Sequence, residues 1–240
     1  MQKNVKHPAA LAELARRYAL DSAQERQLAA ILGLIEQDRR APTSVREPER
    51  AIDVHIADAL VATELAEVRA ARRLVDIGSG AGTPGVALAV ALPRCEVSLL
   101  ESQRRKCAFL EDLVGEAAVA NATVVCARAE EWAAGRERHD VATVRALASQ
   151  PVVLEYAAPL LRLEGVLVDW RGRRDRREEA EAARAGELLG LEPRAVVEVV
   201  PYPQAEYLHL HVWVKRVATP ARFPRRAGIA RKRPLGAKRR

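Results

Sequence analysis

The spacing of hydrophobic residues changes along the chain, and the change predicts two kinds of structure. Over residues 8–37 the apolar side chains recur at helical spacing, which predicts two short helices. We expect Ser22 and Glu25 to form a capping box at the start of the second helix. The apolar stripe of that helix consists of Leu28, Ile31, Leu32 and Ile35. A third helical segment is predicted over 49–68, and these helices together indicate an N-terminal helical cap, residues 1–70, packed on the main domain.

From Arg73 onward, short apolar runs alternate with helical patterns, which is typical of a sheet covered by helices on both faces. The predicted strands are 73–77, 96–101, 122–126, 140–144, 164–169, 195–200 and 207–214. The predicted helices are 84–92, 102–118, 129–134, 151–162 and 175–190. The last strand alternates less cleanly, as expected of an antiparallel strand beside the switch in sheet direction. The pattern predicts an α/β fold with a seven-stranded, mostly parallel sheet in a main domain over residues 71–217.

The composition favours a globular protein and argues against a membrane span. Hydrophobic residues make up 49% and charged residues 30% of the 240 residues, which is typical of a folded domain. The longest uncharged stretch, Ile77 to Pro93, contains four glycines and two prolines, so it does not suit a bilayer. Glu13, Arg16 and Arg17 interrupt the region where a signal peptide would need its apolar core. We therefore expect a cytoplasmic protein with no membrane partner, acting as a monomer.

The three cysteines suggest no chemistry. Cys95, Cys107 and Cys126 are odd in number, far apart in the sequence, and form no pair with metal-ligand spacing. We expect them to be unpaired thiols, and we expect no metal site.

Positive charge is concentrated at the C-terminal end. The net charge is +7, yet residues 215–240 hold eleven Lys or Arg and no acid, while the remainder holds 28 basic and 32 acidic residues. A basic tail of this kind, placed at 218–240, attracts a polyanion by releasing counterions, and nucleic acid is the obvious candidate. A GC-rich genome would also produce many arginines. The candidate RNA-binding residues are Arg222, Arg225, Arg226, Arg231, Lys232 and Arg233.

Two internal basic clusters, Arg171–Arg177 and Arg104–Lys106, either add to the same field or are ordinary solvated faces. Aromatic residues make up only 4% of the chain, which does not favour an extended platform for base stacking. Contacts to phosphates and to the shape of the nucleic acid would therefore dominate.

A glycine loop follows the first predicted strand, and two cofactors compete for it. Glycine lets a ligand approach the backbone closely, and ligands of open α/β sheets bind beyond the carboxyl ends of the strands. Gly80, Gly82 and Gly85 satisfy the GxGxxG pattern of dinucleotide-binding proteins, and Glu101 follows at the expected distance. Asp76 instead resembles the acid in the first motif of Rossmann-like, class I S-adenosylmethionine-dependent methyltransferases.

The position of Asp76 favours S-adenosylmethionine over a nicotinamide cofactor and over a turn that binds nothing. An acid two positions before Gly78 would lie near the cationic methionine end of the donor, whereas it would repel a pyrophosphate. Glu101 would serve either cofactor, because a carboxylate can accept hydrogen bonds from both ribose hydroxyls.

Five motifs together make a more specific resemblance. They are DIGSGAGTPG, LLES followed by RKCAFL, RAEEW, VRALAS, and the tail sequence FPRRAGIARKRPL. The chain resembles the bacterial small-subunit ribosomal RNA guanine-N7 methyltransferase family, also called glucose-inhibited division protein B, over roughly His55 to Leu235. The resemblance implies S-adenosylmethionine as the cofactor, and 16S ribosomal RNA or the small ribosomal subunit as the partner.

The resemblance also implies a set of site residues. Gly78 would lie against the cofactor, Thr83 would line it, and Ala129 would flank the adenine with Glu130. Arg145 would close the site, and an HxxD pattern would lie at its mouth. The expected cofactor-binding residues are Asp76, Gly78, Gly80, Gly82, Thr83, Glu101, Ala129, Glu130 and Arg145. The catalytic residue is not identified, and its candidates are Arg145, Arg171, His55 and Asp58.

The chain departs from the family pattern at four places. Thr83 stands where a large apolar residue is common, and Ala59 stands where the HxxDS pattern has serine. Trp170–Gly172 replaces a more usual Leu-Lys-Gly, so any role of that lysine passes to Arg171, although the two side chains are not interchangeable. The connector 42–44 is a poor match to an asparagine-bearing loop.

Methylation of guanine N7 needs no general base, because N7 has an in-plane lone pair and no proton. The enzyme would align N7, methyl and sulfur and so supply the entropy of orientation. The narrow major groove of A-form RNA hides N7, so the target is expected in a loop or an opened region.

Two alternatives remain at this point: a methyltransferase with a non-RNA substrate, and a non-catalytic RNA-binding ribosome-assembly factor. The hypothesis of an S-adenosylmethionine-dependent rRNA methyltransferase predicts that Gly78→Arg or Asp76→Ala abolishes cofactor binding. It also predicts that deletion of residues 219–240 weakens RNA binding and flattens its salt dependence, and that cofactor affinity barely changes.

Overall fold

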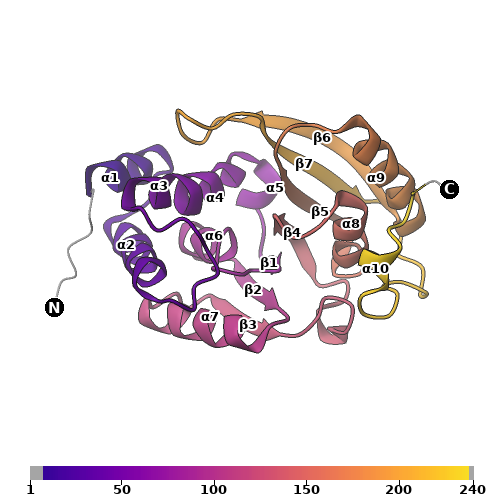
Figure 1. Ribbon diagram of the computed structural model, residues 1–240, viewed down its shortest axis with the longest axis horizontal. Coiled ribbons are helices and arrows are strands. Elements are labelled where there is room, and N and C mark those ends of the chain that lie inside the picture. The colour runs from indigo at the N-terminus through magenta and orange to yellow at the C-terminus, as the bar shows by residue number, and fades with distance from the viewer. Residues whose placement is uncertain (1–7, 238–240) are drawn as a thin grey trace.

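The computed structural model describes residues 8–237, and its centre is one seven-stranded sheet. The strand order is β3-β2-β1-β4-β5-β7-β6, and only β7 runs antiparallel to its neighbours (Figure 1). The strands are β1 (Arg73–Ile77), β2 (Glu96–Glu101), β3 (Ala122–Cys126), β4 (His139–Arg145), β5 (Leu161–Arg171), β6 (Leu191–Val199) and β7 (Leu208–Lys215). The predicted α/β architecture, including the antiparallel last strand, is confirmed.

Helices cover both faces of the sheet because successive strand residues point to opposite sides. One core cluster combines the strands with α6 (Gly85–Ala91), α7 (Arg104–Glu116) and the N-terminal helices. The other combines them with α8 (Gln150–Ala157), α9 (Arg176–Leu189) and the short tail helix α10 (Ile229–Lys232) (Figure 1). None of the helices described over residues 8–237 is long and apolar enough to cross a membrane.

The N-terminal region begins with the two predicted helices, α1 (Pro8–Arg17) and α2 (Ser22–Gln37). The predicted capping box is wrong by one residue, because Asp21 caps α2 with Gln24 as its partner. The apolar stripe of α2 is buried in the same core cluster as α6. The cap and the sheet thus share one core. Residues 1–7 of the predicted cap and 238–240 of the predicted tail lie outside the described residues.

The third predicted helix is divided into short elements with different hydrogen bonding, and the extended backbone at Leu65 interrupts it. It consists of α3 (Pro48–Ala51), a π-helical turn η1 (Ile52–Ala57), α4 (Asp58–Leu60), a 3-10 turn η2 (Val61–Glu64) and α5 (Ala66–Arg69). π-turns inside helices often occur at functional sites, and this one carries His55 and leads into Asp58.

Two expectations about secondary structure were wrong in the main domain. The segment predicted as a helix over 129–134 contains only turns and the start of a 3-10 turn, η3 (Ala133–Gly135), because the backbone of Trp132, with φ −81° and ψ 77°, leaves the helical region. The helix predicted over 151–162 ends at Ala157, since β5 already begins at Leu161.

The cysteine prediction was also wrong, because Cys107 and Cys126 form a disulfide. The two residues are 19 positions apart, but the β2–α7–β3 unit brings the first turn of α7 beside the end of β3, with a Cα–Cα distance of 5.7 Å. Cys95 is free and buried.

Gly85 offers a test of how closely α6 packs on the sheet. A Cβ atom at Gly85 would lie 2.5 Å from Leu99 Cδ2 and 2.7 Å from the Asp76 side chain. We expect Gly85→Ala to lower the free energy of unfolding by about 1–3 kcal/mol, the usual effect of overpacking, as measured by urea denaturation. Gly115→Ala is the control, because nothing lies within 4 Å of its added Cβ. Equal stability of the two variants would contradict close packing at Gly85.

Candidate functional site

The glycine loop begins directly after β1 and packs against the neighbouring strands. The amides of Gly78 and Ser79 both donate to the Leu100 carbonyl, at 2.7 and 3.2 Å. Gly78 has a φ of 77°, and a Cβ atom there would lie 2.7 Å from Leu147 Cδ1. Only glycine satisfies both the backbone conformation and the close approach.

Asp76, expected to lie near the cationic end of the cofactor, is enclosed by the protein. Its side chain is 1% exposed, so it does not face an open site. Its Oδ1 accepts from the Thr143 hydroxyl at 2.8 Å, and its Oδ2 accepts from the Gly85 amide at 3.2 Å. Burial raises the pKa of Asp76 against these hydrogen bonds. The carboxyl group therefore joins β1, β4 and the start of α6 beneath the loop.

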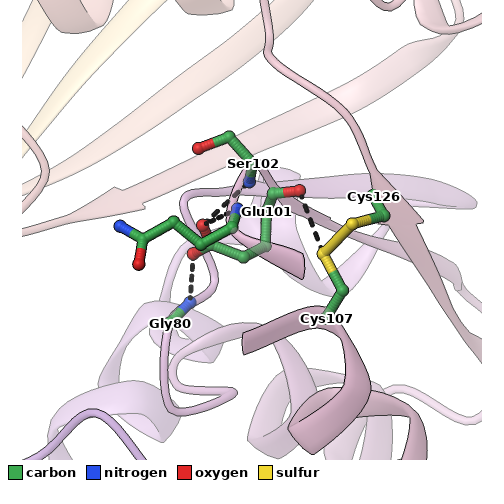
Figure 2. The surroundings of a disulfide bond; sticks show 6 residues. Gly80, Glu101, Ser102, Cys107 and Cys126 are labelled. Atoms are coloured by element: carbon green, nitrogen blue, oxygen red, sulfur yellow. Dashed lines mark hydrogen bonds between the residues drawn. A yellow bond between two sulfur atoms is a disulfide. The ribbon is translucent and has the colours of Figure 1, made fainter. Parts of the chain in front are cut away.

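Glu101, at the end of β2, is held by three backbone amides (Figure 2). Its carboxylate accepts from Gly80 at 3.2 Å, from Ser102 at 2.8 Å and from Gln103 at 2.9 Å. The disulfide lies beside it, and Cys107 Sγ is 3.4 Å from the Glu101 carbonyl oxygen. The glycine loop and the start of α7 are thus fixed around one carboxylate, which keeps lone pairs free for further donors.

A pocket of about 390 Å³, including the space at its mouth, opens beside Gly78 and the carboxyl ends of β1 and β2. Of the nine residues expected to bind the cofactor, Gly78, Ala129 and Glu130 line this pocket. The other six do not line it: Asp76, Gly80, Gly82, Thr83, Glu101 and Arg145. Its other lining residues are Ile77, Leu100, Ser102, Ala127, Arg128, Leu147, Tyr156 and Arg231. The pocket therefore has apolar walls with polar groups at the edge.

The C-terminal tail forms part of this pocket. The Gly228 amide donates to Glu130 Oε1 at 3.0 Å, and Arg231 Nη2 donates to the Leu147 carbonyl at 3.1 Å. Arg225 forms a salt bridge with Glu155 of α8, whose side chain is 1% exposed. The tail is therefore no separate arm, which removes the ground for expecting cofactor affinity to be independent of it.

Arg145, at the end of β4, lies in a second cluster with the N-terminal helices. Its Nη1 donates to Asp58 Oδ2 at 2.7 Å and to the Val54 carbonyl at 2.6 Å. Its Nη2 donates to Thr83 Oγ1 at 2.6 Å. His55 Nδ1 lies 3.4 Å from the same hydroxyl. The cluster joins the π-helical turn, the glycine loop and β4.

The cluster is largely buried, and burial sets its protonation. Burial raises the pKa of Asp58, and the Arg145 guanidinium opposes that shift. Burial lowers the pKa of His55, so its imidazole is neutral at neutral pH. Asp58 Oδ1 is a buried acceptor with no partner among the described residues. The cluster therefore offers one unused acceptor to a hydrogen-bond donor.

Arg171 lies apart from the cluster around Arg145, although the preceding residue, Trp170, contacts that cluster. The Trp170 indole donates to the Asp58 carbonyl at 2.9 Å, and the next residue along β5 points to the other face of the sheet. There Arg171 Nε donates to Asp169 at 2.7 Å and Nη1 to Glu178 at 3.2 Å. The structure thus brings three of the catalytic candidates together and separates Arg171 from them.

The tail residues expected to bind RNA lie in different surroundings. Arg225 is half-buried in its salt bridge, and the exposed Arg231 reaches the pocket. The remaining four are exposed: Arg222, Arg226, Lys232 and Arg233. Sequence reasoning missed Leu147, Tyr156 and the pocket role of Arg231, although the VRALAS and FPRRAGIARKRPL motifs contain two of them.

Solved structures of methyltransferases and related proteins share this fold. MtNAS in complex with S-adenosylmethionine matches with a TM-score of 0.55 and 16% identity, over 89% of this chain and 80% of that chain. A 16S rRNA adenine-N1 methyltransferase from Catenulisporales acidiphilia matches with a TM-score of 0.52 and 16% identity, over 64% of this chain and 89% of that chain. The predicted Rossmann-like methyltransferase fold is confirmed.

Sequence relatives give the family. The proteins named ribosomal RNA small subunit methyltransferase G from Desulfitobacterium hafniense and Rubrobacter xylanophilus are 37% and 38% identical, over 80% and 79% of this chain and 81% and 75% of theirs. That of Synechococcus elongatus is 36% identical over 89% of this chain and 90% of its own. The profile of the rRNA small subunit methyltransferase G family matches residues 9–205. This chain belongs to the rRNA small subunit methyltransferase G family.

Proposed function

We propose that this chain transfers a methyl group from S-adenosylmethionine to N7 of a guanosine in the 16S RNA of the small ribosomal subunit. The observation that carries the proposal is the pocket beside Gly78, which is bordered by a basic tail and belongs to a chain of the rRNA small subunit methyltransferase G family. The proposal assigns the reaction to a single chain acting in the cytoplasm.

The residues of the pocket fit the cofactor. Ile77, Leu100 and Leu147 offer apolar surfaces suited to the faces of an adenine ring, and polar groups at the edge can hydrogen-bond it. Glu101 lies between the lining residues Leu100 and Ser102 and has lone pairs available for ribose hydroxyls beyond the three amides that hold it. Gly78 allows Leu147 to pack closely at the pocket, where any side chain would collide with it. Asp76 contributes by fixing the loop from beneath.

When bound, S-adenosylmethionine supplies a methyl group carried by a positively charged sulfur. Because guanine N7 carries no proton, the chain's residues need only orient and enclose the reactants. Arg145 is fixed by Asp58 and Thr83 between the cap and the glycine loop, so it holds the two sides of the site together. The buried Asp58 Oδ1 can accept a hydrogen bond from a donor in the site. His55, neutral and bonded to Thr43 and the Val45 carbonyl, anchors the cap loop.

The tail would contribute both to RNA binding and to the cofactor pocket. Arg222, Arg226, Lys232 and Arg233 are exposed and remain candidates for RNA phosphates. Arg225 and Arg231 instead attach the tail to Glu155 and to the pocket. A tail fixed at these points would present its free cations beside the cofactor.

Methyl transfer can be tested directly. We expect the chain, incubated with labelled S-adenosylmethionine and either naked 16S rRNA or small subunits, to form 7-methylguanosine, as measured by nucleoside analysis. Gly78→Arg should abolish both transfer and cofactor binding by calorimetry, because its side chain would fill the pocket beside Leu147. Gly115→Ala should retain both. RNA binding without labelled 7-methylguanosine would support an assembly factor, and transfer only to a non-RNA acceptor would overturn the RNA assignment.

The tail gives a second prediction. Arg225→Gln would leave the Glu155 carboxylate buried without its cation, so the tail should detach and cofactor affinity should fall by about tenfold or more. The matched control is Arg226→Gln, which removes the same charge from an exposed neighbour. Deletion of residues 219–240 should reduce cofactor affinity and also flatten the salt dependence of RNA binding. If calorimetry gives Arg225→Gln the cofactor affinity of Arg226→Gln, the tail does not support the pocket.

A further inference from the structure

A second polar cluster lies at the carboxyl end of β5, on the face of the sheet opposite Arg145. Its centre is Gln150, the first residue of α8. Gln150 Nε2 lies 3.3 Å from Asp169 Oδ2 and 3.0 Å from Nδ1 of His211, which pairs with Asp169 across β5 and β7. None of these three side chains has a role in the proposed methyl transfer.

The hydrogen bonds fix which atoms of the cluster carry hydrogen. Gln150 Nε2 donates to a carboxylate, so it is the amide nitrogen and it also donates to His211 Nδ1. The imidazole therefore carries its hydrogen on Nε2. Burial lowers the pKa of His211 to about 4, which keeps the ring neutral at neutral pH. His211 Nε2 is then a donor, and its side chain is 4% exposed.

Two buried donors have no acceptor among the described residues, and both belong to side chains that line one small pocket. They are His211 Nε2 and Arg171 Nη2. The pocket measures about 220 Å³ including its mouth, and it is also lined by Arg173 and Arg174. It lies at the N-terminus of the 14-residue helix α9, where the helix dipole favours an anion.

The acidic residues around the pocket already have partners. Asp175 caps α9 by accepting from the amides of residues 177 and 178. Glu178 accepts from Arg171 and from the backbone amide of Gln150. Glu179 accepts from Arg174. The buried atoms of the pocket that lack a partner among the described residues are both donors, so the group that fits them is an acceptor.

We propose that this pocket binds a non-bridging oxygen of a phosphodiester in the RNA substrate; the inference rests on the proposed function. Arginine and imidazole donors with a helix N-terminus are suited to phosphate oxygens, and most contacts in nucleic-acid complexes are to the backbone. The Arg173 guanidinium lies over the Tyr207 ring, 3.8 Å from its centroid, which places a further cation at the mouth. The pocket lies on the same face of the sheet as the cofactor pocket, and α8 contributes to both.

A charge-conserving variant tests the site. Lysine at position 171 keeps the charge and can reach Asp169, but it lacks the guanidinium fork and so removes the Nη2 donor. We expect Arg171→Lys to weaken binding of a 16S rRNA transcript by about tenfold and to reduce the salt slope by about one phosphate contact. The matched control is Arg177→Gln, which removes a full charge from the same segment, where the side chain is 83% exposed and pairs with Glu181. It should weaken binding less than Arg171→Lys does.

The outcomes separate this inference from the proposed function. Cofactor affinity of Arg171→Lys should equal that of the wild type, which shows that the variant is folded. Should Arg171→Lys not fold, His211→Gln is the second variant, with the same expected loss of RNA affinity. If Arg177→Gln weakens binding as much as Arg171→Lys, only a diffuse basic field is present. If the wild type methylates the RNA and Arg171→Lys binds the RNA with the same affinity as the wild type, the pocket binds no phosphodiester and this inference is wrong. A wild type that neither binds nor methylates rRNA overturns the proposed function together with this site.

Discussion

A carboxylate taken out of water must find hydrogen-bond donors or a cation inside the protein, and this constraint organises the functional edge of the sheet. Asp76 is held by Thr143 and a backbone amide, Glu101 by three amides, and Asp58 by Arg145. In each case at least one donor comes from a different segment than the acid. The carboxylates therefore connect strand ends, the glycine loop and the cap at the places where a ligand would meet the protein.

The same constraint attaches the tail. Glu155 lies inside α8, where an unpaired charge would be costly, and its cation comes from Arg225 some 70 residues away in the sequence. Once this pair forms, Gly228 reaches Glu130 and Arg231 reaches Leu147. A segment that its charge alone would mark as an RNA-binding arm thus forms a wall of the pocket beside Gly78.

The local sequence pattern was sufficient to predict the order of helices and strands and the position of the glycine loop. Both depend on the spacing of hydrophobic residues and glycines, which is a local property of the chain. The local pattern was insufficient wherever long-range packing decides the outcome. Asp76 appeared ready to meet a cationic ligand, yet Gly85 and Thr143 enclose it. Cys107 and Cys126 are distant in sequence, and only the β–α–β unit brings them together. The motifs contained Glu130 and Arg231, but no periodicity shows that a tail folds back.

Strand geometry explains how one edge of a sheet can hold two kinds of chemistry. Consecutive residues of β5 point to opposite faces, so Trp170 supports the Arg145 cluster while Arg171 turns to α9. A departure of this chain from its family pattern falls on these two positions. The indole of Trp170 supplies a donor that fixes the Asp58 carbonyl, and the fork of Arg171 bridges Asp169 and Glu178, which a lysine's single nitrogen would do less well. Trp170 therefore ties the cap to β5 on one face of the sheet, and Arg171 presents an unpartnered donor on the other face.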